Sequence, residues 1–236
     1  MNNNDRVIVI TGTRKGIGRF LAEYYLAQNM IVCGCSRSAC DLDNPRYIHY
    51  ELDVADEKSV EKMVFDIYKR FRKIDFLVNN AGIASMNHSL LTPLSVVEKV
   101  FKTNVMGTFV FCREVAKVMA KNKFGRIVNF ATIATPIKLE GESIYAASKA
   151  AVENMTKLLA KEYADFGITI NAVGPTPVYT DLIKNVPKNK IDSLLQTQAI
   201  HRYGTFEDIV NVIDFFLEDK SNFITGQIIY LGGVSS

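Results

Sequence analysis

Tyr145 and Lys149 are the residues of this chain whose types and spacing most directly suggest chemistry. Residues four apart on an α-helix project from the same face, so we expect the phenol and the ammonium to lie close together. An ammonium beside a phenol favours the phenolate and lowers the pKa of the tyrosine. The pair therefore predicts a proton donor for carbonyl chemistry. The same spacing also arises by chance, and the pair would then only pack a helix and expose a charge.

Three glycines near the N-terminus could hold a nucleotide. Gly12, Gly16 and Gly18 lie in the segment Thr11-Gly-Thr-Arg-Lys-Gly-Ile-Gly18, between an expected strand and an expected helix. Glycine lets the backbone approach a pyrophosphate, and the helix N-terminus offers free N–H groups and the positive end of its dipole. The spacing is neither the Gly-x-Gly-x-x-Gly fingerprint nor a P-loop. Because tight turns also need glycine for steric reasons, the turn indicates a nucleotide only together with other residues.

The end of the second expected strand indicates the type of cofactor. An NAD-binding protein is expected to carry Asp or Glu there for the ribose 2′-hydroxyl, whereas this chain has Ser36 and Arg37. Arg14 and Lys15 lie in the glycine turn, on the same side of the predicted pocket. Cations and a hydroxyl suit a 2′-phosphate, which accepts charge-assisted hydrogen bonds. We therefore predict NADP(H) rather than NAD(H); the alternative is that Arg37 is merely solvated.

Strand and helix patterns alternate along the chain and must position these residues. The patterns predict strands at residues 6–11, 31–36, 47–52, 75–79, 126–131, 168–173 and 227–231. They predict helices at residues 17–29, after Asp56, at 95–121 (one helix or two), at 145–165 and at 206–218, the last beginning with a capping box at Thr205. Such βαβ units predict an α/β fold with a doubly wound parallel sheet and helices on both faces, of the Rossmann type.

The whole chain, residues 1–236, is expected to form a single domain, because no linker or repeat interrupts it. Val178–Tyr203 is the one irregular stretch. Since it follows the carboxyl end of a strand, where such folds bind ligands, we predict a substrate lid over residues 178–203. The alternative is a long surface loop.

Composition excludes several other classes of protein. The net charge is +3, with basic and acidic residues interspersed, which argues against a nucleic-acid partner. Four cysteines without a Cys-x-x-Cys spacing and three histidines far apart predict no metal site. The N-terminus lacks the apolar region of a signal peptide, and no apolar stretch approaches the roughly 20 residues of a membrane span. We expect a cytoplasmic protein that does not enter the membrane.

With these residues placed, the chain resembles the short-chain dehydrogenase/reductase family over essentially its whole length. The matching motifs are Thr11–Gly18, Asp53-Val54, Asn79-Asn-Ala-Gly82, Asn104, Tyr145-x-x-x-Lys149, Asn171–Thr180, Arg202-Tyr-Gly204 with Glu207-Asp208, and Ile224-Thr-Gly-Gln227. The resemblance implies a catalytic set of Asn104, Thr132, Tyr145 and Lys149. It implies a cofactor site made of Gly12, Arg14, Lys15, Gly16, Ile17, Gly18, Ser36, Arg37, Asp53, Val54, Asn80, Ala81, Gly82, Tyr145, Lys149, Pro175, Val178 and Thr180.

The resemblance also implies roles for the catalytic set. Tyr145 would protonate the carbonyl oxygen, and Lys149 would lower its pKa and hold the nicotinamide ribose. Asn104 would hold a water that relays protons between Lys149 and solvent. The family's catalytic serine is replaced by Thr132, which keeps the hydroxyl donor. Thr176 replaces a glycine and would be costly if its φ were positive.

The activity implied is NADPH-dependent reduction of a carbonyl to a secondary alcohol, similar to that of 3-oxoacyl-acyl-carrier-protein reductases. The substrate would be a small carbonyl compound, free or bound to a carrier protein. Lys123 and Arg126 lie where such reductases present basic residues to the carrier, whereas Phe166 stands at a second position expected to be basic. Alternatives are a dehydrogenase or reductase of another small alcohol, sugar or secondary-metabolite ketone, and a cofactor-binding sensor with little turnover. The family resemblance further implies a homodimer or homotetramer.

Overall fold

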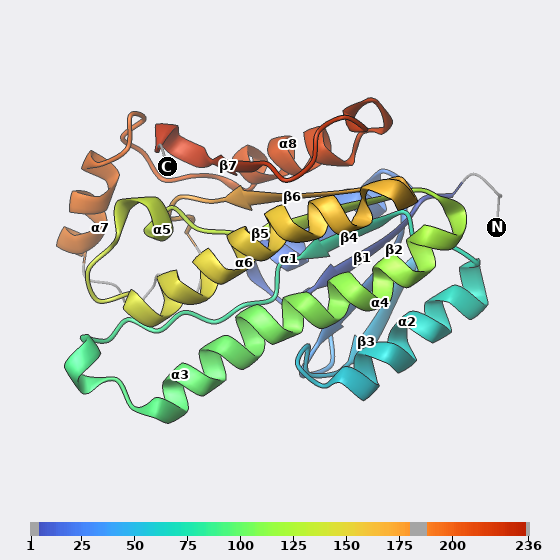
Figure 1. Ribbon diagram of the computed structural model, residues 1–236, viewed down its shortest axis with the longest axis horizontal. Helices are drawn as coiled ribbons and strands as arrows, with labels where there is room; N and C mark the ends of the chain where they lie inside the picture. The colour runs from blue at the N-terminus through green and yellow to red at the C-terminus, as the bar shows by residue number, and fades with distance from the viewer. Residues whose placement is uncertain (1–4, 180–187, 235–236) are drawn as a thin grey trace.

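The computed structural model describes residues 5–179 and 188–234, which form a seven-stranded parallel sheet flanked by helices (Figure 1). The strand order is β3-β2-β1-β4-β5-β6-β7, so the chain reverses its direction across the sheet between β3 and β4. This is the doubly wound arrangement, and it confirms the predicted α/β fold of the Rossmann type. The strands are β1 (Val7–Thr11), β2 (Ile31–Ser36), β3 (Tyr47–Glu51), β4 (Phe76–Asn79), β5 (Gly125–Phe130), β6 (Ile168–Gly174) and β7 (Ile228–Tyr230).

Helices cover both faces of the sheet because its strands are apolar on both sides. In β1, Val7 and Val9 point into one core cluster, and Ile8 and Ile10 point into the other. Burying such a side chain fully contributes about 1.5–3 kcal/mol, which explains why no polar residue interrupts the strand. The first cluster lies under α2 (Glu57–Phe71), α4 (Gly107–Asn122) and α6 (Ser143–Tyr163), the second under α1 (Gly16–Ala27) and α8 (Phe206–Leu217) (Figure 1).

The predicted strands and long helices all occur, with ends shifted by only a few residues. The predicted capping box is also present, since Asp208 N–H donates to Thr205 Oγ1 at 3.2 Å and Thr205 N–H donates to Asp208 Oδ2 at 2.8 Å. Shorter helices complete the fold: α3 (Leu94–Phe101), α5 (Ala134–Ile137), α7 (Lys188–Gln196), and 3-10 turns at Ser89–Leu91, Ala164–Phe166, Asp219–Ser221 and Leu231–Gly233. No helix in the described ranges has the length and apolar character needed to cross a bilayer.

A π-helical turn, Lys102–Met106, joins α3 to α4. The segment predicted as one or two helices is therefore a continuous helical path with one widened turn. A π turn is rare and often marks a functional site. Here the turn contains the buried Asn104, whose backbone carbonyl oxygen accepts a hydrogen bond from Thr108 Oγ1 at 2.7 Å.

The stretch 178–203, predicted to be irregular, contains the helix α7. Ile191 and Leu195 are four residues apart and buried, so one face of α7 packs against the protein. The helix was not predicted because its apolar spacing covers only two positions and directly follows Pro187 and two lysines, which are typical of loops. Residues 180–187, among them the predicted cofactor residue Thr180, lie outside the described residues.

Candidate active site

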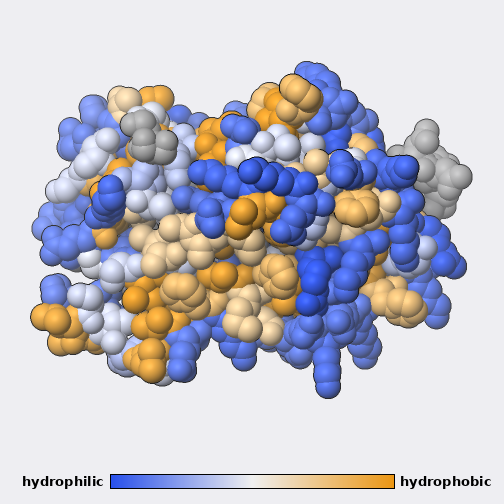
Figure 2. Space-filling view, viewed as in Figure 1, coloured by the Kyte–Doolittle hydropathy of each residue, from blue (hydrophilic) through white to orange (hydrophobic). Residues whose placement is uncertain are grey.

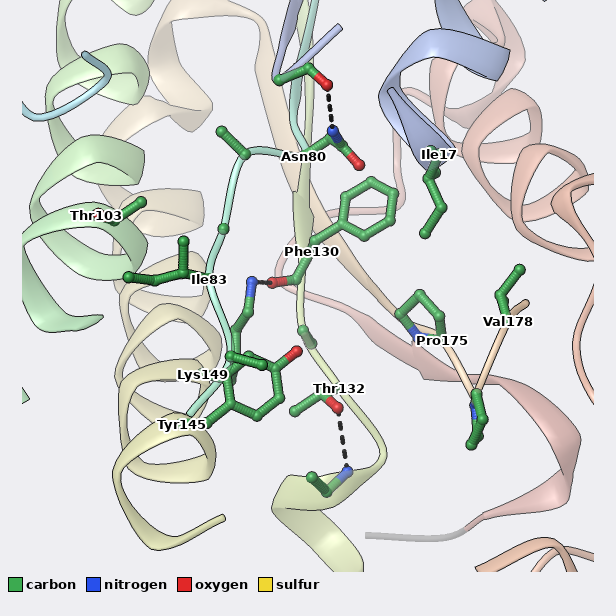
Figure 3. A pocket seen from close by; sticks show the side chains of 18 of the residues that line it. Ile17, Asn80, Ile83, Thr103, Phe130, Thr132, Tyr145, Lys149, Pro175 and Val178 are labelled. Atoms are coloured by element: carbon green, nitrogen blue, oxygen red, sulfur yellow. Dashed lines mark hydrogen bonds between the residues drawn. The ribbon is translucent and has the colours of Figure 1, made fainter. Parts of the chain in front are cut away.

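A cleft of about 610 Å³ lies at the carboxyl ends of the strands (Figure 3). In doubly wound sheets ligands bind at this edge, next to the point where the strand order reverses. The cleft is lined by the glycine turn, by the segments that follow β2, β4, β5 and β6, and by the start of α6 and part of α7. The predicted residues that line it are Gly12, Arg14, Lys15, Gly16, Ile17, Ser36, Arg37, Asp53, Val54, Asn80, Ala81, Gly82, Thr132, Tyr145, Lys149, Pro175 and Val178.

The glycine turn is held tightly against the loop after β4. Asn80 Nδ2 donates to the carbonyl oxygen of Thr11 at 2.8 Å, and the N–H of Ala81 donates to Thr11 Oγ1 at 2.9 Å. A Cβ on Gly18 would collide with the Gly12 carbonyl oxygen and with Asn80 Nδ2, and Gly12 itself has φ +78°. All three glycines are therefore required to close this turn, since Gly16, the first residue of α1, also has a positive φ of +61°.

The cations predicted to bind a phosphate lie together in the cleft. Arg14, Lys15 and Arg37 are exposed and line the same cavity. Ser36 also lines it, but its hydroxyl donates to the Ser38 carbonyl oxygen at 2.6 Å and lies 3.1 Å from His49 Nε2. In this structure the Ser36 hydroxyl therefore shapes the loop that carries Arg37.

A chain of hydrogen bonds, not anticipated from the sequence, links that loop to the glycine turn. Thr13 Oγ1 lies 2.7 Å from Tyr47 Oη, and the same Oη lies 2.8 Å from His49 Nδ1. His49 Nε2 completes the chain to Ser36 Oγ. Alternate side chains on a strand share a face, so Tyr47 and His49 in β3 were the signal that could have revealed it. These hydrogen bonds fix the glycine turn, with Arg14 and Lys15, relative to the loop that carries Arg37.

Lys149 and Tyr145 come together on α6 as predicted (Figure 3). Lys149 is buried, and its Nζ donates to the carbonyl oxygen of Phe130 at 2.7 Å. Removal from water lowers the pKa of Lys149 to about 8, an effect that the nearby carboxylate of Glu153 opposes. A neutral carbonyl is a weaker partner than an anion, so the ammonium is held in place without full compensation for its burial.

The pKa of Tyr145 differs in direction from the prediction. Its pKa is raised to about 12: removal from water is the main cause, the negative charge of Glu142 acts in the same direction, and a hydrogen bond with Thr132 partly opposes both. The expected lowering by Lys149 is not among these causes, because the ammonium points to the Phe130 carbonyl oxygen. Without ligands, therefore, burial outweighs the charge of Lys149.

Asn104 anchors the loop after β4 to the helices behind it. Its Oδ1 accepts from Ile83 N–H at 2.9 Å, and its Nδ2 donates to the Ile83 carbonyl oxygen and to Ser148 Oγ, both at 3.0 Å. A Cβ on Gly82 would lie 3.3 Å from Asn104 Oδ1 and 3.6 Å from Lys149 Nζ. The side chain of Asn104 therefore fixes the wall of the cleft beside Lys149, with both N–H groups of its amide engaged in these contacts.

The two threonine replacements fit the site. Thr132 is buried and faces Tyr145, and its Oγ1 accepts from Ala134 N–H at 3.2 Å (Figure 3). In the described ranges, positive φ outside glycine occurs at four residues, Asn29, Arg72, Lys123 and Lys138. Thr176 is not one of them, so the backbone strain considered from the sequence does not arise.

The comparisons with known proteins agree with this geometry. A family model described as enoyl-(acyl carrier protein) reductase matches residues 12–235. The chain belongs to the short-chain dehydrogenase/reductase family. As a short-chain dehydrogenase/reductase it is an oxidoreductase that uses a nicotinamide cofactor.

Two curated relatives of this short-chain dehydrogenase/reductase differ in activity. An NAD-dependent glycerol dehydrogenase of Listeria innocua is 30% identical over 239 residues, covering 98% of this chain and 94% of the relative. A 3-oxoacyl-[acyl-carrier-protein] reductase of Synechocystis is 32% identical over 239 residues, covering 97% and 96%. Among solved structures, levodione reductase superposes with a TM-score of 0.89 at 28% identity, covering 97% of this chain and 96% of that one. ElxO with NADP bound superposes with a TM-score of 0.88 at 32% identity, covering 96% and 97%.

Two acidic residues of this short-chain dehydrogenase/reductase escaped the sequence analysis. Glu142 precedes Tyr145 by one helical turn and lines the cleft. Glu153 follows Lys149 by four residues on α6 and is buried, which raises its pKa. The i,i+4 spacing to Lys149 was a visible signal for Glu153; burial of Glu142 was not readable from the sequence.

Glu153→Gln is expected to move the alkaline limb of the pH profile to lower pH. The carboxylate of Glu153 raises the pKa of Lys149, so its removal lets burial depress that pKa below about 8. The ammonium is then lost earlier as pH rises, and at pH 8 activity should fall roughly twofold. The measurement is kcat/KM for the nicotinamide cofactor against pH, which reports the free enzyme. Glu162→Gln, an exposed neighbour on α6, is the matched control; equal profiles for all three proteins would contradict the assignment.

Proposed function

We propose that this protein is an NADPH-dependent carbonyl reductase in which Tyr145 is the general acid. The observation that carries the proposal is the convergence of Tyr145, Lys149 and Thr132 in one cleft with the glycine turn. A perturbed pKa on a tyrosine and on a lysine in the same cleft supports a catalytic role for both.

The residues present fit a dinucleotide with a 2′-phosphate. The glycine turn closes so tightly that a side chain at Gly18 is excluded, which leaves backbone N–H groups at the start of α1 open to a pyrophosphate. Arg14, Lys15 and Arg37 would hold the 2′-phosphate, and Asp53 and Val54 would contact the adenine side. NADP bound to the ElxO neighbour supports NADP(H), whereas the glycerol dehydrogenase relative is NAD-dependent.

When bound, NADPH supplies a hydride, which carries both electrons to the carbonyl carbon and leaves NADP⁺. Tyr145 donates its proton to the carbonyl oxygen, so that the π bond is lost, the C–O single bond remains, and one C–H and one O–H bond are formed. Thr132 hydrogen-bonds the phenol and lowers its pKa. Lys149, held by the Phe130 carbonyl, would stabilise the phenolate that remains until a proton from solvent restores it. Asn104 keeps the wall of the cleft in place during these steps.

The burial of Arg126 argues against a substrate bound to a carrier protein. Arg126 is buried in β5, where its guanidinium donates to the carbonyl oxygen of Gly125 at 2.9 Å and stacks over Phe124. The prediction that Arg126 presents a charge to a carrier is therefore wrong, since buried strand residues do not reach a partner. Lys123 remains exposed, and Phe166 is exposed where a basic residue was expected. A free small-molecule carbonyl is the substrate that these surfaces favour.

The test of the proposed function is the loss of NADPH absorbance with a panel of 3-oxoacyl thioesters, simple ketones, hydroxy ketones and keto-sugars, with NADH in parallel. Turnover of at least one compound, faster with NADPH, is expected. NADPH binding without turnover of any of them would instead favour a cofactor-binding sensor.

Arg37→Ala is expected to weaken NADPH binding about ten- to a hundredfold, because charge-assisted bonds to a phosphate are lost. NADH has no 2′-phosphate, so its affinity should change less than threefold. Dissociation constants of both cofactors, measured by fluorescence titration for the wild type and Arg37→Ala, test whether Arg37 contacts the 2′-phosphate. Equal losses for the two cofactors would show that Arg37 does not touch the 2′-phosphate.

We also propose self-association through the face formed by α4 and α6. Figure 2 shows apolar side chains gathered over these helices. Met106, Phe109, Leu158 and Phe166 are exposed there, and large exposed apolar patches mark interaction sites. Sedimentation of the protein as a dimer or tetramer is expected; a monomer at micromolar concentration would contradict this proposal.

A further inference from the structure

Glu142 is a buried acid that faces the cleft. Its side chain is only 9% exposed, yet it is part of the cleft lining. No group in the described part of the chain donates a hydrogen bond to its carboxylate, and burial raises its pKa to about 7. Burying a carboxylate without a hydrogen-bond donor costs free energy of folding. Because this carboxylate faces a cavity, a ligand that carries a donor can supply the missing hydrogen bond.

The position of Glu142 relative to Tyr145 is fixed by the first turn of α6. Ala146 N–H donates to the Glu142 carbonyl oxygen at 2.7 Å, which is the regular i,i+4 bond of a helix. Glu142 is the N-cap residue of α6 and precedes Tyr145 by three positions. The negative charge of Glu142 accordingly raises the pKa of Tyr145. The carboxyl group and the phenol therefore lie close together in the lining of one cleft, where a single small molecule can contact both.

The rest of this part of the cleft is largely apolar. Ile83, Met86, Leu139, Ile191 and Leu194 line it. Such a wall accepts a carbon skeleton but offers no bond to a polar substituent. Glu142 is a buried acid of this lining, three positions before Tyr145, and can accept a hydrogen bond from a hydroxyl or an amine next to the reacting carbonyl; the exposed Glu140 and the buried Thr176 hydroxyl also line the cleft.

We propose that Glu142 is a substrate-binding residue that selects carbonyl compounds carrying a hydrogen-bond donor on the carbon next to the carbonyl. The corresponding products are vicinal diols or amino alcohols. This inference rests on the proposed function, because it places the reacting carbonyl at Tyr145. It favours a hydroxy ketone over a 3-oxoacyl thioester, whose corresponding carbon carries no donor.

The test compares hydroxyacetone with butan-2-one, which differ by the exchange of a hydroxyl for a methyl group. The wild type is expected to prefer hydroxyacetone by about ten- to a hundredfold in kcat/KM, since a bond to a charged acceptor is at stake. Glu142→Leu should reduce this ratio to about one, and Glu142→Gln should give an intermediate ratio because the amide keeps an acceptor. Glu140→Gln removes an exposed acid of the same cleft and should change the ratio less than twofold.

Aminoacetone distinguishes an amine from a hydroxyl as the hydrogen-bond donor on the substrate. If the natural substrate is an amine, Glu142→Gln should lower kcat/KM for aminoacetone at least tenfold more than for hydroxyacetone, because an ion pair is lost. A similar loss for both compounds would assign the hydroxyl.

Binding of the same ketones, measured by ligand-observed NMR with NADP⁺ present, tests substrate selection by Glu142 separately from the proposed reductase activity. A preference for hydroxyacetone that disappears in Glu142→Leu supports the inference even if nothing is turned over, in which case the reductase proposal alone fails. A wild type that shows no preference, or a preference unchanged in Glu142→Leu, overturns the inference and leaves the reductase proposal standing. NADPH affinity of each variant verifies that the cleft is still folded.

Discussion

Tyr145→Phe is expected to lower turnover by about 10²–10⁴-fold, the usual contribution of a positioned general acid. The substitution removes one oxygen and keeps the ring, so the packing of α6 against the cleft is preserved. The oxygen removed is the one whose pKa the surroundings set, through burial, Glu142 and the hydrogen bond with Thr132. The other groups that carry protons beside it have different partners in the proposal: the Lys149 ammonium is held by the Phe130 carbonyl oxygen, and Glu142 is assigned to the substituent next to the carbonyl.

The measurement for Tyr145→Phe is kcat with the best carbonyl substrate, together with the dissociation constant of NADPH. The affinity for NADPH should change less than threefold, because the phosphate-binding residues lie in the glycine turn and after β2. Ser143→Ala, an exposed position at the start of α6, is a control for perturbation of the helix. Loss of turnover and of NADPH affinity by the same factor would mean that Tyr145 acts in binding and not as the acid.

Gly18→Ala is expected to abolish measurable cofactor binding and to destabilise the protein. The added methyl meets the backbone carbonyl of Gly12 and the amide of Asn80, neither of which can move without opening the turn. Overpacking of this kind costs about 1–3 kcal/mol, which corresponds to a fall in Tm of roughly 2–12 °C for a chain of this size. Because the displaced groups form the cradle itself, the affinity for NADPH should fall more than a hundredfold.

Gly141→Ala is the matched control for Gly18→Ala. Gly141 has φ +84°, but a Cβ there would have no atom within 4 Å. Its replacement should cost about 1 kcal/mol of stability through backbone strain alone, with little change in NADPH affinity. Differential scanning fluorimetry and cofactor titration of both variants separate the two effects. Wild-type affinity in Gly18→Ala would show that the turn relaxes freely and that its tightness is irrelevant to the cofactor.

The fold could be predicted because its signals are local. In β1 every residue is buried and β-branched, and the helices that follow carry apolar faces at regular spacing. The convergence of Tyr145, Lys149 and the glycine turn then followed from the topology, since parallel strands deliver their carboxyl ends to one edge. The family motifs added Asn104 and Thr132, which the structure brings to the same cleft or its wall.

What could not be predicted depends on burial and on contacts between distant segments. The sign of the pKa shift of Tyr145 depends on how far the cleft excludes water and on where the Lys149 ammonium points. The isolation of Glu142 depends equally on the walls around it. Arg126 looked like a surface charge because strand ends near loops are usually solvated, yet its guanidinium is covered by Phe124 and the backbone.

The widened turn at Lys102–Met106 limits how the continuous helical segment from α3 to α4 can change in evolution. Each residue of an α-helix advances the chain by about 100°, so the one extra residue rotates everything before it relative to everything after it. Deleting any single residue of the turn would leave α3 and α4 helical but would rotate the buried face of one relative to the other by about 100°. Either Val100 would leave its buried position or Asn104 would leave Ile83. We therefore expect this segment to keep its length among relatives, whereas insertions or deletions should accumulate in the loops on either side of it.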